Sequence, residues 1–469
     1  MKTAKGFILI LLILVFLLCG CTQEPAPPPP ANFTGTVEGY EYYHENERDK
    51  LWEEDIITIA QLYLTKHPWM VDDTTKQIEM ESYVSSYSYD WVNQYIPEKR
   101  ELFLTGINEM IPHIPEYSDN TILWEVQKVF ALLDDCHAVI TPTCDEFFPM
   151  QFYPFYEDGE MTIVTVGLPA SLEHLLYSRL TAIHGVPIAE VLEKMRPYSS
   201  IPLEDGFLYE AIWDINSTPL LIQPYLYQTI GLVDENSLTA EFTFVTESGE
   251  TVTETISAIS QEQLDSMEYI SHSITHQFGY SFATWGEEYL WMEYNEEESL
   301  LYVRIYAFRD DEDEPMLQMV STLQKLITKA ESIDKMILDL RCNPGGHAPD
   351  GYSALVRLMG HEKIEQAYIL INEGSFSMSA LAVYNARCEV PGILVVGAPS
   401  GQELPCGTSS GSKPDTPNHS IRCSIPGAYV VAEDENAPDR IVPDILIYPT
   451  LKDYKNGVDT VLEAVLNME

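Results

Sequence analysis

The stretch KMILDLRCNPGG, residues 335–346, ends an apolar run in a polar turn that contains one proline and two glycines. The apolar part is typical of a buried strand. The turn that follows offers bare backbone at Gly345 and Gly346, where no side chain keeps a ligand at a distance. In open α/β sheets, sites gather beyond the carboxyl ends of the strands. The stretch therefore predicts a functional site at this turn.

Strand-like and helix-like segments alternate on both sides of this stretch. Such alternation is typical of a parallel sheet with crossover helices, so we expect an α/β core over residues 263–469. The segments in chain order are SLLYVRIYAF (299–308), MLQMVSTLQKLITKA (316–330), KMILDL (335–340), GYSALVRLMG (351–360), QAYILIN (366–372), SMSALAVYNARC (377–388) and GILVVG (392–397).

Two further parts precede this core. Residues 149–262 show short alternating runs, and the segment 238–259 has a Ser-Gly pair between two of them, which predicts a hairpin in a mostly β part. Residues 45–148 contain amphipathic helical patterns at 47–70 and 121–135. The chain is thus expected to be α/β, with a helical N-terminal part, a β-rich middle and the α/β core.

The N-terminus has the pattern of an export signal. A basic start and an apolar run over residues 1–18 lead to Leu18, Cys19, Gly20 and Cys21, which resemble the lipobox of bacterial lipoproteins. We therefore expect a leader over 1–21, a lipid on Cys21 and a Pro-rich linker over 22–44. An uncleaved membrane-spanning anchor is the alternative. In both cases the remaining chain is expected outside the cytoplasm, anchored to the cell membrane.

Charge and motif content exclude several classes of partner. The chain of 469 residues has a formal net charge of −47, which disfavours nucleic acid, because that binding requires Lys and Arg to neutralise phosphates. The sequence has neither a Gly-rich phosphate loop nor a Cys-x-x-Cys pair, so no nucleotide or metal cofactor is expected.

The cysteines beyond the leader have two readings. Export permits disulfides, and the short separations favour the pairs Cys136 with Cys144 and Cys406 with Cys423. Free buried thiols are the alternative, because connectivity cannot be deduced from the sequence.

Several segments resemble, in order and spacing, the tail-specific or C-terminal processing serine peptidases, a clan that includes the tricorn protease core. The segment LTAIHGVPIAEVL is similar to a signature of the PDZ-like module of those enzymes, and this similarity makes residues 149–262 a PDZ-like part. The other matching segments are LLDDCHAVI (132–140), ILDLRCNPGG (337–346), INEGSFSMSALAVY (371–384), ILVVGAPSG (393–401) and VPDILIYPTLKDYKNGVDTVLEAVL (442–466).

The resemblance assigns roles around the glycine turn. It implies that Ser377 is the nucleophile and that Gly345, Gly346 and Met378 form an oxyanion hole, in which backbone N–H groups stabilise the negative charge of the transition state. Ser379 is the alternative nucleophile. Ser379 could instead be the N-cap of the helix that begins near residue 380.

The resemblance leaves the general base open. Tail-specific proteases use a Lys, and Gln402 stands at about that place here, with Lys413 in the later segment GSKPD as a substitute. The tricorn branch uses a His, which corresponds to His137, steered by a carboxylate such as Asp439 or Glu435. His347 is a further candidate.

Two functions follow from these alternatives. The first is an extracytoplasmic serine endopeptidase, tethered by lipid, that acts on peptide or protein tails. The second is an inactive peptide-binding lipoprotein on the same scaffold, favoured by the absence of Lys at position 402. A solute-binding lipoprotein is disfavoured, because the sequence lacks a two-lobed repeat of the α/β pattern.

Overall fold

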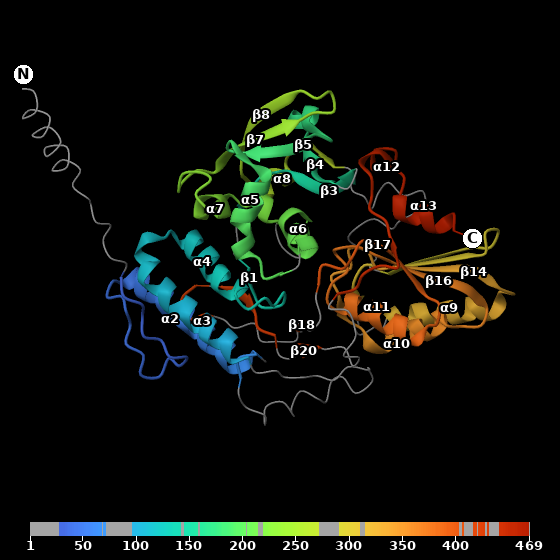
Figure 1. The fold of residues 1–469 in the computed structure, drawn as a ribbon, viewed down its shortest axis with the longest axis horizontal. Coiled ribbons are helices and arrows are strands. Elements are labelled where there is room, and N and C mark those ends of the chain that lie inside the picture. The colour runs from blue at the N-terminus through green and yellow to red at the C-terminus, as the bar shows by residue number, and fades with distance from the viewer. Residues whose placement is uncertain are drawn as a thin grey trace, which may run out of the picture.

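The protein was studied as a computed structural model (Figure 1). It describes residues 28–67, 69–71, 96–141, 145–157, 160–202, 204–213, 219–271, 290–309, 315–402, 406–407, 416–419, 421–426, 429–430 and 440–468. The expected fold class is confirmed: helices at the N-terminal side, antiparallel strands in the middle and a mostly parallel sheet at the C-terminal side.

The C-terminal sheet has six strands in the order β11-β12-β14-β16-β17-β21. All neighbours are parallel except β11 and β12, so an antiparallel strand closes one edge. The strands are β11 (Leu290–Asn295), β12 (Leu300–Ile305), β14 (Ile333–Asp339), β16 (Ile364–Ile371), β17 (Leu394–Gly397) and β21 (Ile445–Leu446).

Helices cover both faces of this sheet (Figure 1). One face packs against α9 (Pro315–Lys329), α10 (Pro349–Met359) and α11 (Met378–Glu389). The other face packs against α13 (Thr460–Leu466). In β12, Leu301 and Val303 face the first core, while Leu300 and Tyr302 face the second. A sheet buried on both faces explains why its strands are almost continuously apolar.

The middle part is a seven-stranded antiparallel sheet. Strands β7 and β8 pair from Thr239↔Ser257 to Val245↔Thr251, which confirms the predicted hairpin. The sheet also carries helices that the β-rich pattern did not indicate. Its elements are β3 (Gln151–Glu157), β4 (Glu160–Pro169), β5 (Arg179–Ile183), β6 (Val186–Pro187), α5 (Ile188–Met195), α6 (Glu204–Trp213), α7 (Pro224–Thr229), β7 (Thr239–Val245), β8 (Thr251–Ser257) and β10 (Tyr269–Ser271).

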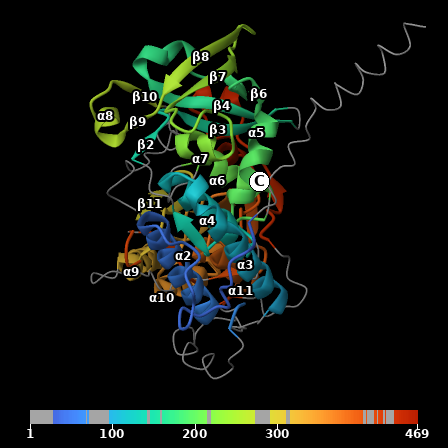
Figure 2. The same ribbon diagram turned by 90° about the vertical axis from the view of Figure 1, so that its left-hand side faces the viewer.

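The N-terminal part packs three helices around one core: α2 (Glu47–Lys66), α3 (Pro97–Met110) and α4 (Asp119–Ala131). A segment from the far end of the chain completes it. Strand β19 (Arg422–Ser424) pairs antiparallel with β1 (Val139–Thr141), and Ile421, Cys423 and Ile425 are buried among the helices. Figure 2 shows α2, α3 and α4 side by side. Strand β19, from the C-terminal region of the chain, therefore fixes β1, the strand that follows α4.

Aromatic packing joins the middle sheet to the C-terminal region. The Tyr454 ring of α12 (Leu451–Lys455) lies 5.3 Å from the ring of Phe155 in β3, centroid to centroid. The remaining short elements are η2 (Ile111–Glu116), β2 (Glu146–Phe147), η3 (Ala170–Leu175), η4 (Arg196–Tyr198), η5 (Leu220–Ile222), β9 (Ile259–Ser260), α8 (Gln261–Asp265), β13 (Phe308–Arg309), β15 (Gly346–His347), β18 (Cys406–Gly407) and β20 (Tyr429–Val430). Among the helices that the structure describes, none is long and apolar enough to cross a membrane.

Candidate active site

Ser377 lies on the sharp turn between β16 and α11, at the carboxyl edge of the parallel sheet. Its backbone has φ 52° and ψ −123°, a region that residues other than glycine rarely adopt. Such backbone strain persists only where the surroundings hold it. The neighbouring Phe376 N–H donates to Asn343 O at 2.9 Å, and the Ser375 hydroxyl donates to Leu340 O at 2.8 Å. The turn is therefore fastened to the glycine turn that follows β14.

His137 reaches this serine from the N-terminal part of the chain. Its Nε2 lies 3.0 Å from Ser377 Oγ, a hydrogen-bond distance. The imidazole comes from the turn between α4 and β1, where the His137 N–H donates to Asp135 Oδ1 at 3.1 Å. Asp135 is itself held by the buried His67, whose Nε2 is 2.9 Å from its Oδ2. The loop that carries His137 is thus held by two hydrogen bonds of Asp135, one with the His137 N–H and one with His67.

Burial sets the charge state of His137. The residue is 7% exposed, and burial lowers its pKa below the ordinary value of 6.5, while the nearby Asp135 carboxylate acts in the opposite direction. The neutral imidazole therefore dominates at pH 7. A neutral imidazole can accept a proton, which is what a general base requires.

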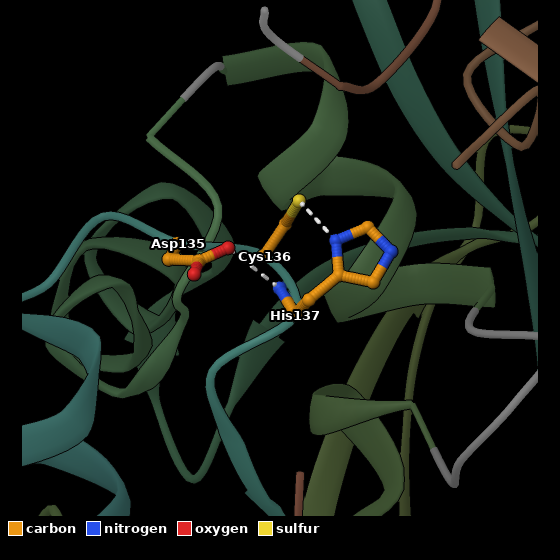
Figure 3. Close-up of side chains that lie close together, drawn as sticks. All are labelled: Asp135, Cys136 and His137. Carbon is orange, nitrogen blue, oxygen red and sulfur yellow. Dashed lines mark hydrogen bonds between the residues drawn. The ribbon is translucent and has the colours of Figure 1, made fainter. Parts of the chain in front are cut away.

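Cys136 contacts the second ring nitrogen of His137, as Figure 3 shows. Its Sγ lies 3.3 Å from Nδ1. If Nδ1 carries the proton, it donates to the sulfur and leaves the Nε2 lone pair facing Ser377. The reverse tautomer would direct an N–H at Ser377 and could not take its proton. Base catalysis thus requires the sulfur to act as acceptor.

Asp135, Cys136 and His137 bring possible metal ligands within 4.8 Å of one another (Figure 3). The two carboxylate oxygens of Asp135 already bond to the His137 N–H and to His67. That leaves one sulfur and one ring nitrogen, whereas a zinc site uses at least three protein ligands. The donor set fits the orientation of His137 better than it fits an ion.

The glycine turn lies directly against Ser377. A Cβ placed on Gly345 would lie 2.5 Å from Ser377 Cβ and 2.8 Å from Met378 N, and Gly345 has φ +97°. Only glycine combines this backbone conformation with this approach. The predicted residues Gly345, Ser377 and Met378 are therefore brought together.

The backbone N–H groups of the predicted oxyanion hole differ in their partners. The Gly345 N–H donates to Asn343 Oδ1 at 2.8 Å, so that donor is engaged. Gly346 stands opposite Phe308 in the parallel pair of β15 and β13, a register that directs its own N–H away from β13. Met378 is the first residue of α11, where an N–H has no intrahelical acceptor. Among the described residues, this geometry leaves the N–H groups of Gly346 and Met378 as the candidate donors for a ligand.

Ser379 is placed differently from the other serine candidate. It is fully buried as the second residue of α11, and among the described residues its Oγ has no hydrogen-bond partner. The N-cap position belongs to Ser377, so the reading of Ser379 as N-cap is wrong. The reason is that the helix begins two residues earlier than its apolar pattern indicated.

Other predicted residues fall outside what the structure describes. Cys21 and the leader lie outside it, as do Lys413, Glu435 and Asp439. His347 is placed as backbone in β15, while its side chain is outside the description. Gln402, at the place of the family Lys, does belong to the site: its side-chain oxygen accepts the Ser377 N–H.

One predicted disulfide is wrong, and the other involves a residue outside the described part of the chain. Cys423, the predicted partner of Cys406, is a free thiol buried in the N-terminal helical core, opposite Ile140 in the β1–β19 pair. Cys144, the predicted partner of Cys136, lies outside the described residues. Short sequence separation misled the prediction, because β19 carries Cys423 away to a different part of the fold. The buried-thiol alternative holds for Cys423.

Sequence reasoning missed the supporting residues. The sequence analysis assigned no role to Cys136 and Asp135, which contact His137. It also assigned no role to Asn343, which hydrogen-bonds to Gly345 in the glycine turn. The signal was present, because all three lie inside the quoted motifs LLDDCHAVI and ILDLRCNPGG.

Comparisons with known proteins give a match to a family model. The family model described as peptidase family S41 matches residues 299–368, the segment from β12 to β16. The match spans part of the α/β core. No curated protein matches the chain.

Solved structures share the fold at low sequence identity. Mature CPAF is 12% identical with a TM-score of 0.53, covering 89% of this chain and 96% of its own. A CPAF mutant gives 12% and 0.56, with 87% and 95% covered. Mature CPAF complexed with lactacystin gives 13% and 0.54, with 89% and 97% covered.

Proposed function

We propose that this chain is a serine endopeptidase of family S41 in which Ser377 is the nucleophile and His137 the general base. The observation that carries the proposal is the 3.0 Å distance from His137 Nε2 to Ser377 Oγ. A serine hydroxyl is a weak nucleophile until a neighbouring base takes its proton. The burial of the His137 imidazole, which lowers its pKa, supports this role because the neutral ring can accept a proton.

The reaction follows from the neighbouring groups. Ser377 Oγ attacks the carbonyl carbon of the substrate while its proton passes to His137 Nε2. The negative charge that develops on the carbonyl oxygen is stabilised by the N–H groups of Met378 and Gly346; removing one such donor typically costs about 3–4 kcal/mol of transition-state stabilisation. His137 then gives the proton to the leaving amine, and water hydrolyses the acyl-enzyme by the same steps in reverse order.

A fluorophosphonate probe tests this assignment. The purified protein should gain one phosphonyl group on Ser377, located by peptide mass spectrometry, and should cleave casein. Ser377→Ala should lose both activities. A wild-type protein that binds peptide but neither reacts with the probe nor cleaves would instead be the peptide-binding protein on this scaffold.

The substrate class in this proposal is the unstructured tail of exported proteins. The resemblance of several segments to tail-specific peptidases supports this class. A folded model protein with and without a flexible C-terminal extension distinguishes it from a general peptidase. Only the extended form should be degraded.

A lipid on Cys21 would tether the enzyme outside the cytoplasm. The lipobox-like residues Leu18 to Cys21 and the Pro-rich run after them support this location. The full chain should partition into the detergent phase and incorporate labelled fatty acid, and Cys21→Ala should do neither. A variant that is still processed and still partitions into detergent would rule out the lipid anchor.

A further inference from the structure

Gln402 lies beside the nucleophile in a place that sequence resemblance gives to a lysine. Its side-chain Oε1 accepts the backbone N–H of Ser377. The residue is 1% exposed, so the contact is shielded from water. The Ser377 N–H is therefore engaged and leaves the oxyanion to other donors.

The loop that carries Gln402 is fastened along its length. After β17, the Ala398 N–H donates to Ile371 O at 3.1 Å and the Gly401 N–H donates to Glu373 O at 3.0 Å. The Ser400 N–H donates to Ile441 O, also at 3.0 Å. A side chain on a loop held in this way is a fixed support.

Helix α6 of the middle part covers this loop. A Cβ on Gly206 would lie 2.1 Å from Gly401 O, so the two backbones are in direct contact. The contact packs the middle part against Gly401, the residue that directly precedes Gln402.

The orientation of the Gln402 amide is determined by its partner. A backbone N–H can only donate, so the atom facing Ser377 must be the oxygen and the NH₂ group must face elsewhere. Among the described residues no acceptor lies within hydrogen-bond reach of Nε2, although the atom is buried. Buried donors in native proteins nearly always have a partner. A substrate carbonyl oxygen is an acceptor of the required kind.

We propose that Gln402 is a positioning residue for Ser377 through its oxygen and a substrate-binding residue through its NH₂ group, which donates to a backbone carbonyl of the bound peptide. The oxygen holds Ser377 at φ 52°, the conformation that places Oγ against His137. The assignment rests on the proposed peptidase function and adds to it one residue that both supports the nucleophile and binds substrate.

Two variants separate the two roles. Gln402→Glu keeps an oxygen for the Ser377 N–H but has no NH₂ group, whereas Gln402→Leu has neither. Gln366→Leu is the matched control, because Gln366 lies at the other end of β16, where its amide bonds to Ala367 O and Gly392 O. Each protein is tested for probe labelling rate, for peptide kcat and KM, and for amide exchange in a peptide spanning residues 374–379.

The expected results differ by role. Gln402→Leu should label about tenfold more slowly or worse, and its 374–379 segment should exchange faster, because a lost hydrogen bond near the nucleophile has at least this effect. Gln402→Glu should keep the exchange protection and label within about threefold of wild type, yet lose about tenfold in peptide kcat/KM, for the same reason. The Gln366→Leu control should match wild type.

Each of the following outcomes overturns all or part of the assignment. Wild-type labelling and exchange in Gln402→Leu would remove the positioning role, and wild-type peptide kcat/KM in Gln402→Glu would remove the substrate-binding role. A melting curve checks that each variant is folded. If Gln402→Leu does not fold, the test relies on the isosteric variant Gln402→Glu. If the wild-type protein reacts with neither probe nor peptide, both the peptidase proposal and the role of Gln402 are wrong. If the wild type is active and both Gln402 variants behave like it, only the role of Gln402 is wrong.

Discussion

His137 Nε2 and Ser377 Oγ lie 3.0 Å apart although 240 positions separate the two residues in the chain. One side chain follows a helix of the N-terminal part and the other precedes a helix of the α/β core. Their contact depends on strand β19, which returns from the C-terminal region to pair with β1 directly after His137. The candidate active site is thus assembled across two parts of the fold.

Ser377→Ala should abolish peptide cleavage and probe labelling without loss of stability. The hydroxyl supplies the attacking atom, so kcat should fall by at least about 10³-fold. Ser379→Ala is the matched control, because its hydroxyl is buried without a partner among the described residues. Labelling rates and thermal melting check both variants. An active Ser377→Ala with an inactive Ser379→Ala would move the nucleophile by two residues.

The pH profile should identify the base. Burial lowers the pKa of His137 below 6.5, so kcat/KM should rise with pH, reach its midpoint below 6.5 and be level by about pH 7.5. A lysine base, whose ordinary pKa is about 10.4, would move the rise to higher pH. His137→Ala should remove the activity, and Lys413→Ala should leave the profile unchanged. The reverse pair of results would favour a Ser/Lys dyad.

The lowered pKa of His137 also makes the stability of the folded protein depend on pH. Because the pKa of His137 is lower in the folded protein than in the unfolded chain, the unfolded chain binds more protons between the two values. The free energy of unfolding contributed by this site is therefore complete above the unfolded pKa and falls as the pH drops through it. Urea unfolding at pH 7.5 and pH 5.5 should show a smaller pH effect in His137→Ala than in wild type.

Cys136 should matter through the orientation of His137. Cys136→Ala removes the atom 3.3 Å from Nδ1 and should lower kcat/KM by roughly tenfold, the scale of one lost hydrogen bond. Cys136→Ser keeps an acceptor and should be closer to wild type. The exposed Cys388 provides the control variant Cys388→Ser. Equal activity of Cys136→Ala and wild type would mean that the thiol does not orient the imidazole.

Gly345→Ala should inactivate the enzyme. The added methyl group would lie 2.5 Å from Ser377 Cβ, at a residue with φ +97°. Gly392→Ala is the matched control: its φ is +80°, but nothing lies within 4 Å of the added methyl. Both variants should lose about 1–2 kcal/mol of stability from the backbone conformation. Only Gly345→Ala should also lose probe labelling, and labelling at the wild-type rate would contradict the close approach.

Arg341→Met should destabilise the core strongly. Arg341 is buried between Asp339 and Asp459, with Nη2 at 2.6 Å from an oxygen of each. Its charge holds the pKa of Asp339 at about 2 against an opposing effect of burial. Removing one partner of a buried ion pair costs about 3–5 kcal/mol. The partly exposed pair of Arg387 and Asp444 supplies the control Arg387→Met, which should cost at most about 1 kcal/mol.

Acidification should reduce the difference between wild type and Arg341→Met. In wild type the depressed Asp339 pKa stabilises the fold above the unfolded value of 3.8, and this contribution is lost as the pH falls toward 2. Without the arginine, the carboxylates protonate more readily and their burial costs less. Urea unfolding at pH 7 and pH 4 checks this, and an unchanged difference between the two proteins would argue against a charge effect.

The alternation of apolar segments was enough to predict the α/β core. Strands such as β14 and β16 are buried on both faces, so each contains a continuous apolar run, MIL in β14 and AYILI in β16, that stands out between amphipathic helices. The glycine turn could also be predicted from the sequence, because two adjacent glycines directly after a buried strand form a pattern only a few residues long. The helices of the middle part escaped prediction because α6 and α7 are short segments within a β-rich pattern.

The sequence by itself therefore determined the layers of the fold and the residues offered to the site: the serine, the two glycines and a histidine in a recognisable segment. Only the tertiary structure decided how these residues combine. It places His137 within hydrogen-bond distance of Ser377, and it shows that Gln402, at the place of the family lysine, accepts the Ser377 N–H. It also buries Cys423 in the helical core, away from the disulfide that its position in the chain suggested. Secondary structure depends on patterns a few residues long, whereas these contacts depend on the pairing of β19 with β1 and on the packing of loops from distant segments, which no local pattern encodes.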